Sequence, residues 1–214
     1  MRRQVDMKGL LLKDWFMMKS YCKAYVFIVA VFLGVALFNE GNMFFLIYPS
    51  MLGGLIPITL LSYDERSHWN QYCCTLPATK AEFVSAKYLI GLLTSITLIV
   101  ITVLSQFAKM VVTGRYNISD LVVLFFVLLI ISLIPPACCL PFMYKLGVEK
   151  GRLAYYFVIG LICALAVIAA SFISLAPDIE IKPNLVMGIL VIAALVIYVI
   201  SWRLSIKFYE RRED

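Results

Sequence analysis

Long apolar runs constrain the fold of this chain more than any other feature. A run of roughly 20 apolar residues can cross the hydrocarbon core of a bilayer as a helix. The chain is 63% hydrophobic and 15% charged, whereas an average soluble domain has about 25% charged residues. We therefore predict an all-α polytopic membrane protein with a six-helix transmembrane domain, residues 24–204. The predicted spans are 24–38, 43–61, 88–112, 121–144, 153–174 and 185–202.

The basic residues predict the orientation of these spans. With both termini inside, the inner segments hold 16 of the 19 lysines and arginines. This bias follows the positive-inside rule and predicts cytoplasmic termini. The net charge of +6 then follows from topology and does not indicate nucleic-acid binding. The inner segments are 1–23, 62–87, 145–152 and the tail 203–214.

Residues 1–23 have the pattern of a helix that lies in the inner membrane interface. Lys8 and Lys19 flank an apolar stripe and suit contact with lipid head groups. The predicted stripe consists of Met7, Leu11, Trp15, Met18 and Cys22.

The longest polar interval, 62–87, contains two signals for a helix start. Ser62 with Glu65, and Thr79 with Glu82, have the spacing of a capping box. Between them, four residues recur at helical spacing and form one apolar face. This face consists of Trp69, Tyr72, Cys73 and Leu76. It suits either docking to a partner at the membrane surface or a helix that rests on its own lipid.

Prolines and hydroxyls mark irregular or polar places in the spans. Pro49 and Pro57 predict a bent second span, and three prolines predict that the cytoplasmic third of 121–144 departs from regular helix. These three are Pro135, Pro136 and Pro141. The many hydroxyls of 88–112 either bond to their own or neighbouring backbone or line a pore.

No catalytic motif occurs, so we do not expect an enzyme. His68 is the only histidine, and the six cysteines show no zinc-binding spacing. The predicted span cores hold no Asp, Glu, Lys or Arg except Lys109. Ion-coupled carriers usually need such a group, so a transport protein of this kind must take its energy from a partner.

Two stretches resemble the small six-span permease subunits of type-2 ATP-binding-cassette (ABC) exporters. One is LSYDERSHWNQYCCTLPATKAEFVSAKYL, residues 61–89, with its acidic pair, aromatic residue, Leu-Pro and Lys-Tyr. The other is LPFMYKLGVEKGR, residues 140–152. Among such permeases the chain is most similar to exporters of amphipathic peptide toxins of the phenol-soluble-modulin kind.

The resemblance implies that two permease subunits pair, as a homodimer or heterodimer, and that each docks on a cytoplasmic ATPase. It implies that the cytoplasmic coupling helix between spans 2 and 3 meets that ATPase, together with the second connection. ATP and Mg would bind the ATPase, with no cofactor on this chain. The expected location is a bacterial plasma membrane, and the expected cargo is an amphipathic or hydrophobic substrate. The ATPase-docking residues would be Asp64, Glu65, Trp69, Tyr72, Cys73, Leu76, Gly147 and Glu149.

A second function remains open from the sequence. A stand-alone membrane protein, such as an immunity factor or a sensor, would use the polar loop 62–87 to bind a regulator. An adjacent gene for a P-loop ATPase would favour the exporter.

Overall fold

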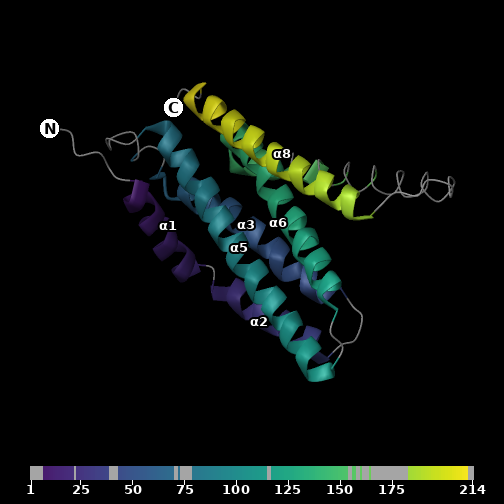
Figure 1. Ribbon diagram of the computed structural model, residues 1–214. Coiled ribbons are helices and arrows are strands. Elements are labelled where there is room, and N and C mark those ends of the chain that lie inside the picture. Colours follow the sequence, from purple (N-terminus) through teal and green to yellow (C-terminus); the bar gives the residue numbers. More distant parts are fainter. Residues whose placement is uncertain are drawn as a thin grey trace.

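The computed structural model is a bundle of helices, and the all-α prediction is confirmed for the residues that it describes (Figure 1). These residues are 7–21, 23–38, 43–69, 72, 79–114, 117–153, 156, 157, 160, 164 and 183–211. The helices are α1 (Met7–Tyr21), α2 (Lys23–Phe38), α3 (Phe44–Arg66), α5 (Lys80–Thr113), α6 (Ile118–Leu146) and α8 (Pro183–Arg211).

Four of the described helices are long and apolar enough to cross a membrane: α3, α5, α6 and Met187–Arg211 of α8. Counting α1 and α2, which are bent by 65° relative to each other, as one broken span gives five. Most of the predicted span 153–174 lies outside the described residues. The six-span count therefore stays a prediction.

The second capping box is confirmed and the first is wrong. Thr79 Oγ1 accepts the Glu82 amide at 3.2 Å, and Glu82 Oε2 accepts the Thr79 amide at 2.8 Å, which starts α5. Ser62 and Glu65 lie inside α3, which runs on to Arg66. The sequence between Pro57 and Arg66 contains no residue that stops a helix, so the apolar span simply continues into the polar interval.

The prediction that α6 loses its regular helix at the prolines is also wrong. Helix α6 is continuous through Pro135, Pro136 and Pro141. A proline lacks the amide that would bond to the carbonyl four residues earlier. For Pro141 that carbonyl belongs to Ala137, and Ser201 Oγ of α8 donates to it at 2.6 Å. A neighbouring helix thus satisfies the freed group, as membrane interiors require.

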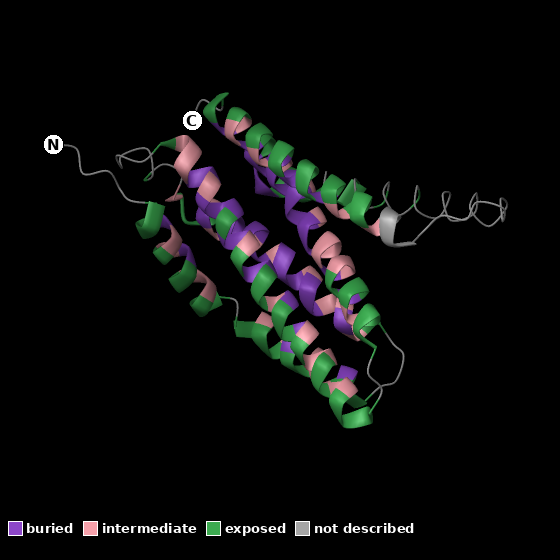
Figure 2. Cartoon of the chain, in the orientation of Figure 1, coloured by how far each residue is buried: buried purple, intermediate pink, exposed green. Residues whose placement is uncertain are grey.

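Helix α3 lies at the centre of the bundle. Its apolar window is 61% buried, whereas that of α8 is 22% buried, and Figure 2 shows the buried residues concentrated around α3. Glycine permits this close packing. A Cβ on Gly54 would lie 2.4 Å from the Ser132 carbonyl oxygen of α6, and one on Gly91 would lie 2.9 Å from Pro57 Cγ.

The predicted N-terminal helix is present as α1, and the contact of its predicted stripe with lipid stays a prediction. Leu10 and Asp14 are buried, while Trp15 and Phe16 are 53% and 61% exposed. Helix α1 packs against α5, α3 and α2. Its orientation follows from a buried carboxylate, which apolar periodicity could not reveal.

Candidate functional site

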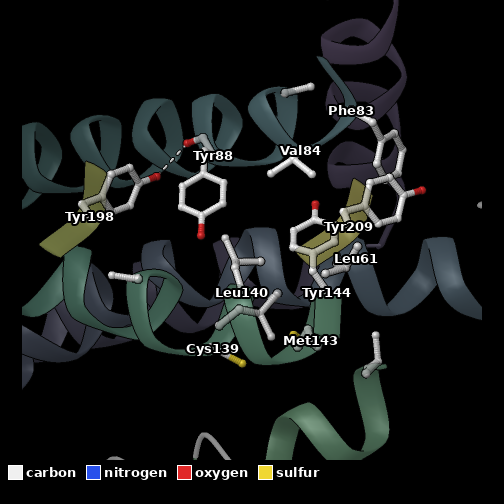
Figure 3. Close-up of a cluster of buried hydrophobic side chains, with 14 of the residues drawn as sticks. Leu61, Phe83, Val84, Tyr88, Cys139, Leu140, Met143, Tyr144, Tyr198 and Tyr209 are labelled. Carbon is white, nitrogen blue, oxygen red and sulfur yellow. Dashed lines mark hydrogen bonds between the residues drawn. The ribbon is translucent and has the colours of Figure 1, made fainter. Parts of the chain in front are cut away.

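An aromatic cluster joins α5, α6 and α8 near the start of α5 (Figure 3). Phe83 stacks on Tyr209 with ring centroids 5.7 Å apart, and Tyr144 meets Tyr209 edge-on at 5.3 Å. We predicted residues 203–214 as a tail, but α8 continues to Arg211 and Tyr209 is buried. The end of α8 is therefore part of the packed bundle at this end.

Beside this cluster, four charged side chains form a closed ring, here called the charge ring. Lys13 Nζ lies 2.7 Å from Asp64 Oδ1 and 3.3 Å from Asp14 Oδ1. Lys87 Nζ lies 2.6 Å from Asp14 Oδ1 and 2.6 Å from Asp64 Oδ2. The Lys87–Asp64 contact is an ion pair outside hydrogen-bond geometry. Positive and negative charges alternate around the ring, and its net charge is zero.

The charge ring is almost completely removed from solvent. The side chains of Asp14, Asp64 and Lys87 are 1–2% exposed, and only Lys13 is 23% exposed. Buried charges of this kind require partners, because an isolated charge in a low-dielectric interior is very costly. Asp64, which we expected to face the ATPase, therefore has its partners inside this chain.

Glu65, the other acidic residue of the pair, binds the second connection. Its Oε2 accepts the Val148 backbone amide at 2.6 Å. Gly147 ends α6 with a positive φ of 84°, and the Gly151 amide donates to its carbonyl as helix resumes. A carboxylate at the start of a helical segment caps its free amides. Glu65 thus docks the segment that follows Gly147 onto the end of α3.

A second bond fastens the same two segments together. Arg152 Nη2 donates to Ser62 Oγ at 2.7 Å. In addition, a Cβ on Gly151 would lie 2.7 Å from Met143 Cα, so this segment packs tightly against α6. The structure therefore brings the two predicted cytoplasmic connections to one end of the bundle.

The aromatic residues of the polar interval lie at this same end. Trp69 and Tyr72 have ring centroids 5.3 Å apart. Trp69 is half-buried against the core, with Lys13 Nζ 4.3 Å from its ring centroid. Tyr72 is 57% exposed, and Glu149 is also exposed. Cys73 and Leu76 lie outside the described residues. The predicted docking residues that the structure describes, other than Asp64, are here called the docking surface; they are Glu65, Trp69, Tyr72, Gly147 and Glu149.

The charge ring was missed by sequence reasoning in three of its members, Lys13, Asp14 and Lys87. The available signal was an aspartate on α1 between Lys13 and Trp15, and a lysine at the entrance to a span. Within the described residues, no group of three or more His, Cys, Asp or Glu side chains could hold a metal ion. The arrangement can bind and position, and it offers no constellation for catalysis.

The long apolar helices define a polytopic helical membrane protein, and the charge ring and the docking surface lie at one end of its bundle. Residues 9–210 match the family described as ABC-2 family transporter protein, and the chain belongs to that family. Comparison with curated proteins gave no match, and comparison with solved structures gave none either. Membership makes the chain a membrane transport component and implies an ABC ATPase as partner.

Proposed function

We propose that this chain is the permease subunit of an ATP-driven exporter and that a separate ATPase docks on its cytoplasmic end. The observation that carries the proposal is the convergence of both polar connections at one end of the bundle. Glu65 holds the segment after Gly147. Trp69 packs against the buried cluster that includes Val148, and its ring meets that of Tyr72. Aromatic anchors dominate many interfaces, and one can contribute about 2 kcal/mol or more.

The distribution of charge supports an external source of energy. Lys109 is the one residue among Asp, Glu, Lys and Arg in the predicted span cores, and it donates to the Ala36 carbonyl at 2.8 Å. Ala36 lies in the last turn of α2, where the helix dipole favours a positive charge. Lys109 therefore has a structural partner, and we assign it no role in ion coupling. ATP and Mg would bind the ATPase, with no cofactor on this chain.

The proposed cargo is an amphipathic or hydrophobic molecule, such as a peptide toxin, that enters from the membrane and leaves the cell. Its class rests on the resemblance to peptide-toxin exporters and on the apolar spans. We further propose a pair of permease subunits in a bacterial plasma membrane, surrounded by lipid, with both termini cytoplasmic. Nucleic acid is not an expected partner.

Within the docking surface we assign contact with the ATPase to Trp69, Tyr72 and Glu149, with Cys73 and Leu76 continuing the predicted face. Glu65 and Gly147 shape the second connection. We reassign Asp64 from contact with the ATPase to the charge ring, since both of its carboxylate oxygens are within 2.7 Å of lysines of this chain.

Pull-down of the ATPase by membrane-inserted permease variants tests the proposal. Tyr72→Ala removes an exposed anchor, and Trp69→Ala removes its half-buried neighbour. A loss of about 2 kcal/mol corresponds to roughly thirtyfold weaker association. Phe16→Ala is the matched control, because Phe16 is an exposed aromatic residue on α1 that lies outside the docking surface.

The second candidate, a stand-alone immunity factor or sensor, predicts a different result. Such a protein would bind no ABC ATPase in wild-type form, and its phenotype would not depend on any ABC ATPase gene. The assignment of the docking surface would be wrong if Tyr72→Ala and Trp69→Ala both bound the ATPase normally and exported a dye-labelled amphipathic helical peptide normally.

A further inference from the structure

We infer that the charge ring is the positioning element that fixes the docking surface to α1 and to the membrane-spanning helix α5. Lys13, Asp14 and Lys87 would be positioning residues for coupling, with Asp64 as their shared partner. This inference rests on the proposed function, because it gives the ring its role between the ATPase contact and the spans.

The topology of the ring ties three helices together pairwise. The Lys13–Asp64 pair joins α1 to α3, and the Lys87–Asp64 pair joins α5 to α3. The Lys87–Asp14 pair joins α5 to α1. No two of these helices can separate without opening an ion pair that is shielded from water. Opening it leaves an uncompensated buried charge, which is strongly unfavourable.

Lys13 connects the ring directly to the docking surface. Its ammonium lies 4.3 Å from the Trp69 ring centroid while it contacts both aspartates. A displacement of Trp69 by a bound partner therefore displaces a member of the ring. Lys87 then carries the displacement into α5, which runs from Lys80 to Thr113. The ring converts a contact at the end of the bundle into movement of a span.

Phe83 extends the same connection to α8. Its ring centroid lies 5.8 Å from Lys13 Nζ and 5.7 Å from Lys87 Nζ, and the ring also stacks on that of Tyr209. Four charges are a poor means of adding stability, since well-packed apolar side chains of similar volume do as well or better. Their alternating order instead permits one arrangement of the three helices.

Distance measurements between spin labels test the inference on the full chain. In a cysteine-free background, Leu12→Cys and Arg66→Cys place nitroxides on exposed positions beside Lys13 and Asp64. The variant Lys13→Gln with Asp64→Asn removes one positive and one negative charge and leaves the Lys87–Asp14 pair. In nanodiscs without ATPase, we expect the distance distribution to broaden and to shift to longer values.

The control is Lys8→Gln with Asp120→Asn, which removes the same two charge types at exposed positions and should leave the distribution unchanged. If the first variant fails to insert, Lys13→Gln alone keeps Lys87 between both aspartates and should also broaden the distribution. An unchanged distribution in whichever variant inserts would overturn the inference.

A second measurement adds the ATPase to the same variants. We expect the Lys13→Gln, Asp64→Asn permease still to bind the ATPase, because Trp69, Tyr72 and Glu149 are unchanged in it. The dye-labelled amphipathic peptide taken up by inverted vesicles per ATP hydrolysed should fall at least about fivefold. An unchanged ratio would contradict the coupling role. Absence of ATPase binding by the wild-type chain would instead contradict the proposed function, and the spin-label result would still decide whether the ring positions the surface.

Discussion

Glu65 and Val148 are 83 positions apart in the sequence, yet the Glu65 carboxylate accepts the Val148 amide at 2.6 Å. The bond places an acceptor from the end of α3 at the start of the helical segment that follows α6. Charge-assisted bonds of this kind are shorter and stronger than neutral ones. Together with the Arg152–Ser62 bond, this side chain therefore sets the relative position of the two connections.

Replacing Glu65 tests this dependence. Glu65→Ala leaves the amides at the start of the segment without an acceptor, and we expect a loss of about 1–2 kcal/mol in the free energy of unfolding. Thermal unfolding of the purified permease in detergent measures the effect. Glu149→Ala, which removes an exposed carboxylate from the same segment, is the control and should change the unfolding temperature little.

The bond from Ser201 to Ala137 predicts a specific rescue. Ser201→Ala leaves the Ala137 carbonyl, already freed by Pro141, without its donor in the bundle interior, at an expected cost of about 1–2 kcal/mol. In Pro141→Ala the backbone amide of residue 141 can bond to that carbonyl. The serine substitution should then cost clearly less in this background. A double-mutant cycle in thermal unfolding measures the difference.

Thr97→Val is the matched control for the serine variant. The Thr97 hydroxyl is exposed and donates to the Leu93 carbonyl of its own helix, at 2.8 Å. Its removal should cost much less than removal of Ser201. Equal losses of stability in Ser201→Ala and Thr97→Val would contradict a stabilising role for the bond between Ser201 and the Ala137 carbonyl. The same role would be contradicted if Ser201→Ala cost as much in the Pro141→Ala background as it does with Pro141 present.

Apolar run length predicted the spanning helices well. The predicted span 43–61 corresponds to α3 from Phe44, and Thr79 with Glu82 correctly predicted where α5 begins. Both signals are local, since they depend on the residues of one segment. The polar end of α3 was not predicted, because Ser62 and Glu65 have local cap spacing but take partners in another segment.

The charge ring could not be predicted for a related reason. Asp14 and Lys87 are 73 positions apart, and their pairing follows from the packing of α1 against α5. Helical periodicity shows which residues share a face and does not show which helix that face meets. For the same reason the apolar stripe of α1 did not reveal that Asp14 is buried.

Close packing at Gly54 gives a third prediction. A Cβ at this position would lie 2.4 Å from the Ser132 carbonyl oxygen, which is backbone and cannot move aside without shifting α6. We expect Gly54→Ala to lower the free energy of unfolding by about 3 kcal/mol. Yield of folded protein and thermal unfolding measure this loss.

Gly188→Ala is the control in the same kind of helix. Among the described residues, no atom beyond the chain neighbours of Gly188 and its own stretch of helix backbone lies within 4 Å of a Cβ built there. Alanine favours helix over glycine by up to about 1 kcal/mol. This variant should be unchanged or slightly more stable. A Gly54→Ala protein as stable as Gly188→Ala would contradict the close contact between α3 and α6.

The length of α5 leads to a prediction of topology. The helix has 34 residues and is therefore about 50 Å long, which exceeds the roughly 30 Å hydrocarbon core of a bilayer. Its start lies at the charge ring, near Ser67 at the end of α3, and its other end carries the exposed Thr113. Ser67 and Thr113 should thus face opposite sides of the membrane.

Cysteine labelling decides which side is which. In a cysteine-free background, an impermeant maleimide added to intact cells should label Thr113→Cys. Ser67→Cys should be labelled only after the cells are permeabilised, because 16 of the 19 basic residues fall on its side of the predicted topology. Labelling of Ser67→Cys in intact cells would place the docking surface outside the cell, where no ATPase could reach it.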